Sequence, residues 1–250
     1  MTEGSERIWQ EFSLANAYNP AQIHRWRLVR DEVQSVSAGA ATIVDLGCGS
    51  GALLERLAGV GNATKLIGID LEPRALALAH ERLPLAEFHR ADLERPDGFE
   101  LADLAGRADV VVCSEVLEHL EQPRHALALA LRLLRPGGAL VVTVPAGPMN
   151  AFDRSIGHVR HYSVASLSAL LADNGFGVSR SYAWGFPFHT AFRMGIGMAP
   201  TVVDSFSDSR MSTSKRMLFR LIGALFWLNL RSRHVGRQLV AAAVRPETTT

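Results

Sequence analysis

Continuous apolar runs alternate with helical segments through the middle of this chain, and this alternation limits the fold more than any other feature. The apolar runs lie at residues 41–47, 65–71, 86–93, 109–114 and 138–145. Helical stretches separate them at residues 52–58, 73–82 and 123–134. Strands that are apolar on both faces are typical of a parallel sheet that helices cover on both sides. We therefore expect an α/β fold built on a doubly wound sheet.

The rest of the chain continues this pattern in an order that predicts one domain. A turn-rich loop at 146–163 precedes a helix at 164–174 and a strand at 177–183, and a last strand follows at 237–244. The chain has 250 residues, 48% of them apolar, which is enough to bury one sizeable core. We expect a single domain over residues 1–250, with a helical cap at 1–40, a core at 41–185, a helical insertion at 186–236 and the last strand at 237–246.

Charge and cysteine content bear on partners and compartment. The formal net charge is +1, so no overall positive field would hold a nucleic-acid backbone, and nucleic acid is not an expected partner. The first residues contain acids and Trp9 where a secretory signal needs a basic start and an apolar run. Cys48 and Cys113 show no CxxC spacing, which is typical of reduced core cysteines. We therefore expect a cytoplasmic protein.

A glycine-rich segment follows the first apolar run and indicates a ligand-binding loop. Residues 44–51 read VDLGCGSG, and glycines there let the backbone turn sharply and approach a ligand closely. A nicotinamide-binding fold would also place glycines at this point. The dinucleotide pattern GxGxxG, however, needs glycine where this chain has Ala52 or Leu54. Cofactors that carry a pyrophosphate are therefore disfavoured.

Two carboxylates follow the next two apolar runs and predict a cofactor with a nucleoside part. Asp70 follows Gly51 by 19 residues, close to the roughly 20-residue spacing at which a carboxylate accepts hydrogen bonds from ribose hydroxyls. Asp92 ends the third run, where it could accept an adenine amino group while Leu93 packs on the ring.

Taken together, these segments resemble a known enzyme family. VDLGCGSG, GIDLEP, RADLE, DVVVCSEVLEHLEQP and LRPGG resemble the successive motifs of class I S-adenosyl-L-methionine (SAM)-dependent methyltransferases, in order, over about residues 40–185. The resemblance implies a Rossmann-like, seven-stranded sheet whose last strand is antiparallel, with SAM as the cofactor. A Rossmann-like sheet that binds another ligand remains the alternative.

The resemblance also implies where the cofactor lies. It places the methionine part beside Gly47, Gly49 and Gly51, the ribose at Asp70, the adenine at Asp92 and Leu93, and the sulfonium beside Ser114 and Glu115. Asp45 and Leu71 lie in the same motifs and complete the core of the expected binding set. The N-terminal helix is expected to close over the cofactor, with Tyr18 or Arg25 near the methionine carboxylate. Both residues read equally well as surface and cap residues.

An acid and histidine cluster follows the fourth apolar run. Glu115, Glu118 and His119 have ExxEH spacing, which puts them on one face of a helical turn, and the loop GHVRHYS adds His158 and His161. Carboxylates and imidazoles together suit manganese, iron or zinc better than magnesium. The pattern resembles that of ubiquinone-pathway O-methyltransferases and of small-RNA 2′-O-methyltransferases, and the latter resemblance makes His158 the fourth ligand beside Glu115, Glu118 and His119.

The same cluster has a second interpretation without a metal. In that case the acids cap a helix, touch the cofactor or face solvent. His119, His158 or His161 then serves as the general base for a substrate hydroxyl or amine, since imidazole has a pKa near ~6.5. Glu115 remains a catalytic candidate through its place beside the sulfonium.

The insertion before the last strand carries an unusual apolar helix. Residues 209–246 contain no acid, and residues 217–230 read MLFRLIGALFWLNL, apolar nearly all round. A bilayer takes ~20 residues to span, so this segment is too short. Three interpretations stay open: a lid over an apolar substrate or a homodimer interface, a helix lying on an anionic membrane, and an ordinary core helix.

These features predict a methyltransferase that acts on an oxygen, less favourably a nitrogen or carbon, of a hydrophobic small molecule, with or without assistance from a metal. Two alternatives remain. One is an RNA 2′-O-methyltransferase, and the other is a non-catalytic SAM-binding protein that sits on a membrane surface.

Overall fold

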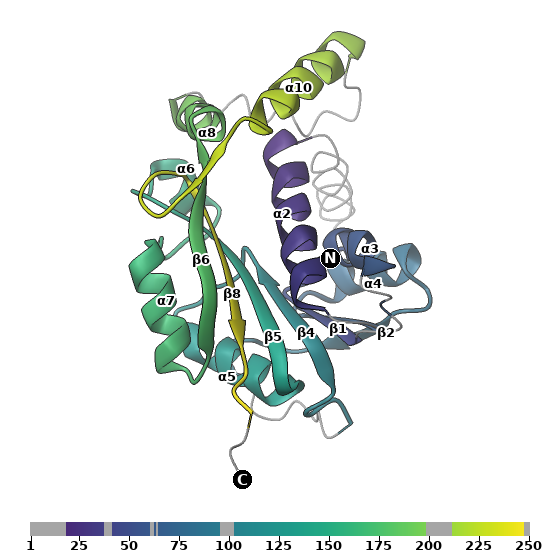
Figure 1. Cartoon of the computed structure of the whole chain (residues 1–250). Coiled ribbons are helices and arrows are strands. Elements are labelled where there is room, and N and C mark those ends of the chain that lie inside the picture. The colour runs from purple at the N-terminus through teal and green to yellow at the C-terminus, as the bar shows by residue number, and fades with distance from the viewer. Residues whose placement is uncertain are drawn as a thin grey trace.

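An eight-stranded mixed sheet forms the centre of the protein in a computed structural model that describes residues 19–37, 42–60, 63, 65–95, 103–198 and 212–247 (Figure 1). Its order is β3-β2-β1-β4-β5-β8-β6-β7. The strands from β1 to β5 pair in parallel, while β8 lies antiparallel between β5 and β6. The strands are β1 (Thr42–Leu46), β2 (Lys65–Asp70), β3 (Glu87–Arg90), β4 (Ala108–Ser114), β5 (Leu134–Pro145), β6 (Gly177–Phe186), β7 (Leu230–Ser232) and β8 (Gln238–Val244).

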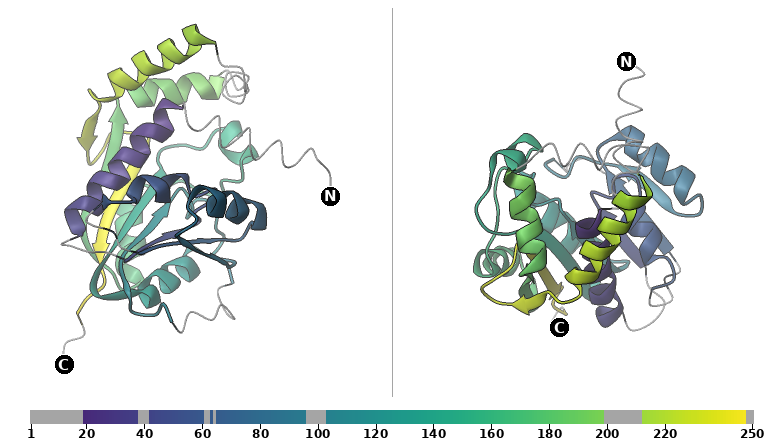
Figure 2. Two further views of the ribbon diagram at one scale, coloured as in Figure 1. Left: turned by 90° about the vertical axis from the view of Figure 1, so that its right-hand side faces the viewer. Right: turned by 90° about the horizontal axis from the view of Figure 1, so that it is seen from above.

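Helices cover both faces of this sheet. Those with described bounds are α2 (Pro20–Val36), α3 (Ala52–Leu57), α4 (Pro73–Arg82), α5 (Pro123–Leu133), α6 (Ala151–Ser155), α7 (Val164–Asp173), α8 (Phe188–Met198) and α10 (Thr213–Phe226). Helices α2 and α3 pack on one face, and α5 and α7 pack on the other. Figure 2 shows α8 and α10 together beyond the carboxyl ends of the parallel strands.

The core explains why the apolar runs are continuous. Alternate residues of β4 point to opposite faces, so Val110 and Val112 pack beneath α2 and α3 while Val111 packs beneath α5. All three side chains are fully buried. The doubly wound α/β sheet expected from the sequence is therefore confirmed, including its antiparallel last strand.

The structure also corrects the expected elements at three places. The sheet has an eighth strand, β7, because three residues after α10 pair with β6. Helix α6 interrupts the segment expected to be only a loop, since Asn150 and Asp153 form a capping box at its start. The apolar helix runs from Thr213 to Phe226 and not from 217 to 230, because the Ser212 side chain accepts the N–H of Lys215 and caps its start.

Helix α2 is fixed to the sheet by a buried carboxylate that the sequence did not mark. Glu32 is 1% exposed, and its oxygens accept hydrogen bonds from the Tyr182 hydroxyl at 2.9 Å and the Arg180 guanidinium at 2.9 Å. Trp26 and Val29 pack on the core from the same helix. A buried charge needs such partners, so these contacts hold α2 over the carboxyl ends of the strands.

The two cysteines form no disulfide bond. Cys48 and Cys113 are buried free thiols, and burial raises the pKa of both. Among the helices of the described residues, none is both long and apolar enough to cross a membrane.

Truncation of a central core side chain should show how tightly the sheet is packed. Leu140 of β5 is fully buried, so Leu140→Ala should lower the free energy of unfolding by about 2–5 kcal/mol through lost burial and a new cavity. Leu85→Ala is the control, because that side chain is fully exposed and its loss should change stability by less than about 0.5 kcal/mol. Urea denaturation followed by circular dichroism measures both, and equal effects would contradict this packing.

Candidate active site

The glycine loop after β1 forms a cradle that is open at one position. Gly47, Gly49 and Gly51 have φ of 73°, 52° and 72°, in the left-handed region that favours glycine. A Cβ at Gly47 would collide with Val116, and one at Gly51 would lie 3.1 Å from the Cβ of Ala79. A Cβ at Gly49 would meet no atom within 4 Å. The loop is therefore closely packed on its inner side and open on the side where a ligand would approach.

Two carboxyl groups lie beside this loop, that of Asp70, which is half-buried, and that of Asp45, which is buried. Asp70 at the end of β2 accepts the N–H of Gly49 at 2.8 Å and the N–H of Glu72 at 2.9 Å. These contacts fix its carboxylate next to the open side of the glycine loop. Asp45 lies deeper in β1, and its burial, followed by the charge of Asp70, raises its pKa to about 8. Its side chain is 2% exposed, so Asp45 is part of the interior and not of the open side of the loop.

The remaining residues expected at the adenine end lie on the adjacent strand end. Asp92 follows β3 and accepts the N–H of Glu94 at 2.9 Å. Leu93 beside it is buried, whereas Leu71 after β2 is half exposed. Neighbouring strands thus bring Asp70 and Asp92 to the same edge of the sheet, as a nucleoside would require. Tyr18, the other expected contact, lies outside the described residues.

Glu115 is held in an unusual backbone conformation directly after β4. Its φ is 58°, a conformation that costs a residue with a side chain about 1–3 kcal/mol. Its N–H donates to the carbonyl of Thr143 at 2.9 Å. Its carboxylate accepts from Arg25 at 2.9 Å, Gln238 at 2.7 Å and Thr143 at 3.2 Å. Ser114 precedes it and its hydroxyl lies 2.8 Å from that of Thr143. These contacts fix Glu115 at the carboxyl ends of β4 and β5.

Arg25 reaches this point from α2. Its ion pair with Glu115 is largely shielded, with 14% and 18% of the two side chains exposed. Gln22 on the same helix also contacts the guanidinium. The structure therefore brings Arg25 to the site, where its guanidinium binds the carboxylate of Glu115.

The ExxEH turn and the histidine loop meet, as expected. Potential ligand atoms of Glu118, His119 and His158 all lie within 4.8 Å of one another, and so do those of Asp153, His158 and His161. His158 Nδ1 lies 3.0 Å from His161 Nε2, and the His119 and His158 rings are 4.7 Å apart. Glu115 is in neither group, since its carboxylate is directed to Arg25 and Gln238. The expected metal set is thus brought together except for Glu115.

Glu118 is the residue that argues most directly for a bound metal ion. Its side chain is fully buried, and neither carboxylate oxygen has a hydrogen-bond partner among the residues that the structure describes. Burial, followed by the charge of Glu115, raises the pKa of Glu118 well above its usual range. A buried carboxyl without a partner is costly, and a divalent ion held with His119 and His158 would remove that cost. The residues therefore fit a metal.

The buried imidazoles beside it are uncharged at neutral pH. Burial, followed by the neighbouring His119 and His161, lowers the pKa of His158 to about 4. Burial also lowers the pKa of His161, whose Nδ1 lies 3.0 Å from the carbonyl oxygen of Gly147. An uncharged imidazole has a free nitrogen lone pair, which can bind a metal or accept a proton.

Several residues of this site were not expected from the sequence. Asp153 is 1% exposed, and its carboxylate forms an ion pair with the guanidinium of Arg193 at 2.8 Å. Gln238 and Thr143 donate hydrogen bonds to the carboxylate of Glu115. The sequence carried two weak signals. Asn150 and Asp153 have the spacing of a helix cap, and Gln238 is a polar residue at the start of an apolar strand.

Two adjoining cavities lie over this cluster. They have volumes of about 310 Å³ and 110 Å³ and share Asn150, Asp153 and Arg193. Met194 lines the larger one, while Arg25 and Phe192 line the smaller one. An acceptor bound in either cavity would lie close to Asp153, and one in the smaller cavity would also lie close to Arg25.

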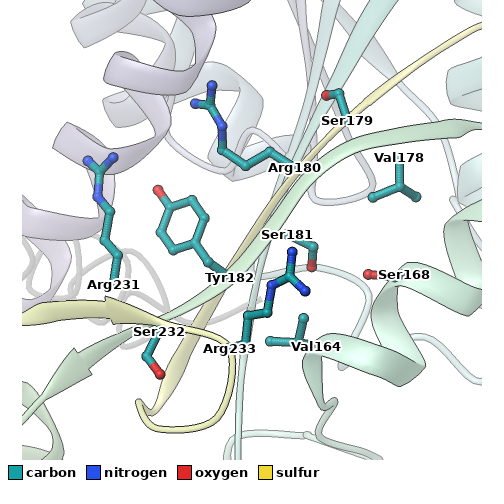
Figure 3. Close-up of a pocket in the computed structure, with 10 residues that line it drawn as sticks. All are labelled: Val164, Ser168, Val178, Ser179, Arg180, Ser181, Tyr182, Arg231, Ser232 and Arg233. Carbon is teal, nitrogen blue, oxygen red and sulfur yellow. The ribbon is translucent and has the colours of Figure 1, made fainter.

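A wider cavity of about 680 Å³ lies elsewhere, at the edge of the sheet (Figure 3). Arg180 and Tyr182 reach from β6 towards α2, while Ser168 lines the opposite side from α7 (Figure 3). Because its walls lie on both sides of the sheet edge, its polar groups do not converge on one point. Chemistry is better placed at the carboxyl ends of the strands.

Comparisons with known proteins agree with this placement. Residues 21–180 match the family model described as a methyltransferase domain. A ubiquinone biosynthesis O-methyltransferase of Thiobacillus denitrificans is 36% identical over 143 residues, which cover 55% of this chain and 57% of the relative. A mitochondrial ubiquinone biosynthesis O-methyltransferase of Schizosaccharomyces pombe is 37% identical over 102 residues, 40% of this chain and 36% of the relative. The match thus spans about half or less of these relatives' lengths.

Among solved structures, N-methyltransferase NodS from Bradyrhizobium japonicum in complex with S-adenosyl-L-homocysteine has a TM-score of 0.57 at 22% identity. The match covers 92% of this chain and 89% of NodS, and at that identity it shows the fold. The family model covers more than half of the chain, and the glycine cradle with Asp70 fits the family's cofactor. The chain therefore belongs to the class I SAM-dependent methyltransferases.

Proposed function

We propose that this protein transfers a methyl group from SAM to a hydroxyl oxygen of a hydrophobic small molecule. The observation that carries this proposal is the acid and histidine cluster of Glu118, His119, His158, His161 and Asp153, because Asp153 also lines both of the adjoining cavities. That group can take the proton that a hydroxyl must lose. The curated relatives named as O-methyltransferases support oxygen over nitrogen or carbon.

The cofactor end of the site is assigned to the strand ends from β1 to β4. The open side of Gly49 would receive the methionine part, the fixed carboxylate of Asp70 the ribose, and Asp92 with Leu93 the adenine. Bound SAM supplies an electrophilic methyl group on a sulfonium. The protein's contribution is then mainly alignment of the acceptor with that methyl group, which is worth several kcal/mol in well-ordered sites.

The acceptor end is assigned to the cavities between α2, α6 and α8. Phe192 and Met194 give an apolar lining that suits a hydrophobic acceptor, and Met adapts to irregular shapes. Arg25 and Arg193 are each bound to a carboxylate, while Arg237 adds a positive charge to the wall of the larger cavity. The acceptor hydroxyl would point towards His161, whose uncharged ring nitrogen would accept its proton.

A divalent ion held by Glu118, His119 and His158 is part of this proposal, with Asp153 and His161 next to it. Such an ion would supply positive charge that favours the deprotonated form of an acceptor hydroxyl. The histidines and carboxylates suit manganese, iron or zinc.

The two alternative functions, an RNA 2′-O-methyltransferase and a non-catalytic SAM-binding protein, receive no support from these two relatives, which are named as O-methyltransferases of ubiquinone biosynthesis.

Removal of the Asp70 carboxylate should abolish tight cofactor binding. We expect Asp70→Ala to weaken S-adenosyl-L-homocysteine binding at least tenfold, because charge-assisted hydrogen bonds to the ribose and the anchor of the Gly49 N–H are lost together. Isothermal titration calorimetry measures the affinity. Asp173→Ala is the matched control, since that aspartate is exposed at the end of α7. Wild-type affinity in Asp70→Ala would contradict the assignment.

Metal binding should depend on the buried carboxylate and its imidazole neighbours. Titration of the metal-free protein with Mn²⁺ or Zn²⁺ should show one site, and Glu118→Ala and His158→Ala should each weaken it at least tenfold. Glu81→Ala on the exposed side of α4 is the control and should bind like the wild type. The metal proposal is wrong if the wild-type protein binds neither ion and chelators leave its activity unchanged.

The product of the reaction tests the function directly. The protein is incubated with methyl-labelled SAM and a panel of apolar aromatic compounds that carry hydroxyl or amino groups, and mass spectrometry locates the label. We expect O-methylated products with the wild-type protein and with Asp173→Ala, and none with Asp70→Ala. Label found only on nitrogen, or on no compound while S-adenosyl-L-homocysteine still binds, would count against transfer to oxygen.

A further inference from the structure

Helix α10 carries two apolar faces, and only one of them is covered. Phe219, Ile222 and Phe226 face inward, where Phe226 is 1% exposed and packs with Trp184 and with Leu28 of α2. The opposite face is formed by side chains spaced three or four residues apart. They are Met217, Leu218, Leu221, Leu225 and Leu228, which are 44–63% exposed.

This outer face lies at the end of the molecule. Figures 1 and 2 show α10 as the outermost helix beyond the carboxyl ends of the strands, with α2 and α8 on its inner side. Trp227 at its end is 66% exposed, and the guanidinium of Arg27 lies 3.4 Å from its ring centroid. A contiguous apolar surface of this kind is rare on a monomeric soluble protein and marks a contact with a partner.

The charges around the face identify the partner. Residues 209–246 contain no aspartate or glutamate. Arg216 and Arg220 of α10 are exposed beside the apolar face, whereas Arg231 and Arg233 line the cavity at the sheet edge and Arg231 lies 3.9 Å from the carboxylate of Asp31. The cations beside the apolar face are therefore those of α10 itself. An apolar strip flanked by cations complements an anionic lipid surface, where the side chains enter the acyl region and the cations meet phosphates.

We propose that α10 docks this protein on an anionic lipid bilayer, lying in the plane of the interface. The helix has 14 residues, too few to cross a bilayer but enough to lie on one. Trp227 is suited to the headgroup level, where indole rings are enriched. The carboxyl ends of the strands then face the membrane.

This orientation puts the bilayer next to the acceptor site, a step that rests on the proposed function. His24 of α2 contacts Phe226 and Trp227, and the next residue, Arg25, is paired with Glu115. A groove of about 430 Å³ runs between α2 and α10 and is lined by Ile23, Phe219 and Trp227 together with Arg216 and Arg220. A hydrophobic acceptor dissolved in the bilayer would therefore lie close to α2, whose Gln22 and Arg25 line the smaller cavity of the active site.

Vesicle co-sedimentation of the full chain tests the docking without any methyl acceptor. Wild-type protein should sediment with phosphatidylcholine vesicles that contain phosphatidylglycerol, and much less with phosphatidylcholine alone. The double variant Leu221→Glu, Leu225→Glu should bind at least about tenfold more weakly, since two apolar contacts are replaced by repelled charges. Leu85→Glu is the matched control, because it changes an exposed leucine in the turn before β3 and should bind like the wild type.

A second variant tests the contribution of the positive charges separately from that of the apolar face. Arg216→Gln with Arg220→Gln leaves the apolar face intact and should reduce binding several-fold at low salt, with a smaller difference at high salt. Titration with S-adenosyl-L-homocysteine should give wild-type affinity for every variant, so loss of docking is distinguished from loss of the cofactor site. The proposal is overturned if wild-type protein stays in the supernatant. It is also overturned if light scattering shows a dimer that Leu221→Glu, Leu225→Glu dissociates while lipid binding is unchanged.

Discussion

The ion pair between Arg25 and Glu115 is the contact on which the arrangement of the site depends. It joins α2 to the end of β4, and it holds a residue in a left-handed conformation at the point where the parallel strands end. Glu115 lies near the buried Glu118 and raises the pKa of that carboxyl, whereas Arg25 lowers it. Burial and the neighbouring carboxylate of Glu115 disfavour a negative charge on Glu118, and the guanidinium of Arg25 opposes this effect only in part.

Helix α2 connects the two ends of the molecule through neighbouring residues. Glu32 fixes the helix to β6 through Tyr182 and Arg180, so the position of Arg25 follows from packing at a distance from the site. His24 faces α10 while Arg25 faces Glu115. Adjacent residues of α2 therefore contact α10 on one side and Glu115 on the other.

The juxtaposition of Asp70 and Gly49 was predictable because each follows a strand, and the parallel sheet brings such positions together. Gln238 was not predictable in this way, since it meets Glu115 across 123 residues of chain. Asp153 lies close to His158 in the sequence, but its position follows from its contact with Arg193, 40 residues away. For α10 the apolar pattern was nearly continuous, so no periodicity could tell which face was covered. Only the packing of Phe226 against Trp184 decides that.

The cofactor end and the acceptor end of the proposed site are built from different structural elements. The cofactor cradle consists of a loop and strand ends whose geometry is fixed by backbone hydrogen bonds, and any change there disturbs the sheet. The proposed acceptor cavities are formed by side chains of α2, α6 and α8, among them the Arg193–Asp153 ion pair. Met194 is 54% exposed, so its substitution would alter the shape of the larger cavity without altering any strand. In the proposed function, the same scaffold can therefore keep one methyl donor while its acceptor changes, because the acceptor would be selected by these helices and by the surface on which α10 is proposed to lie.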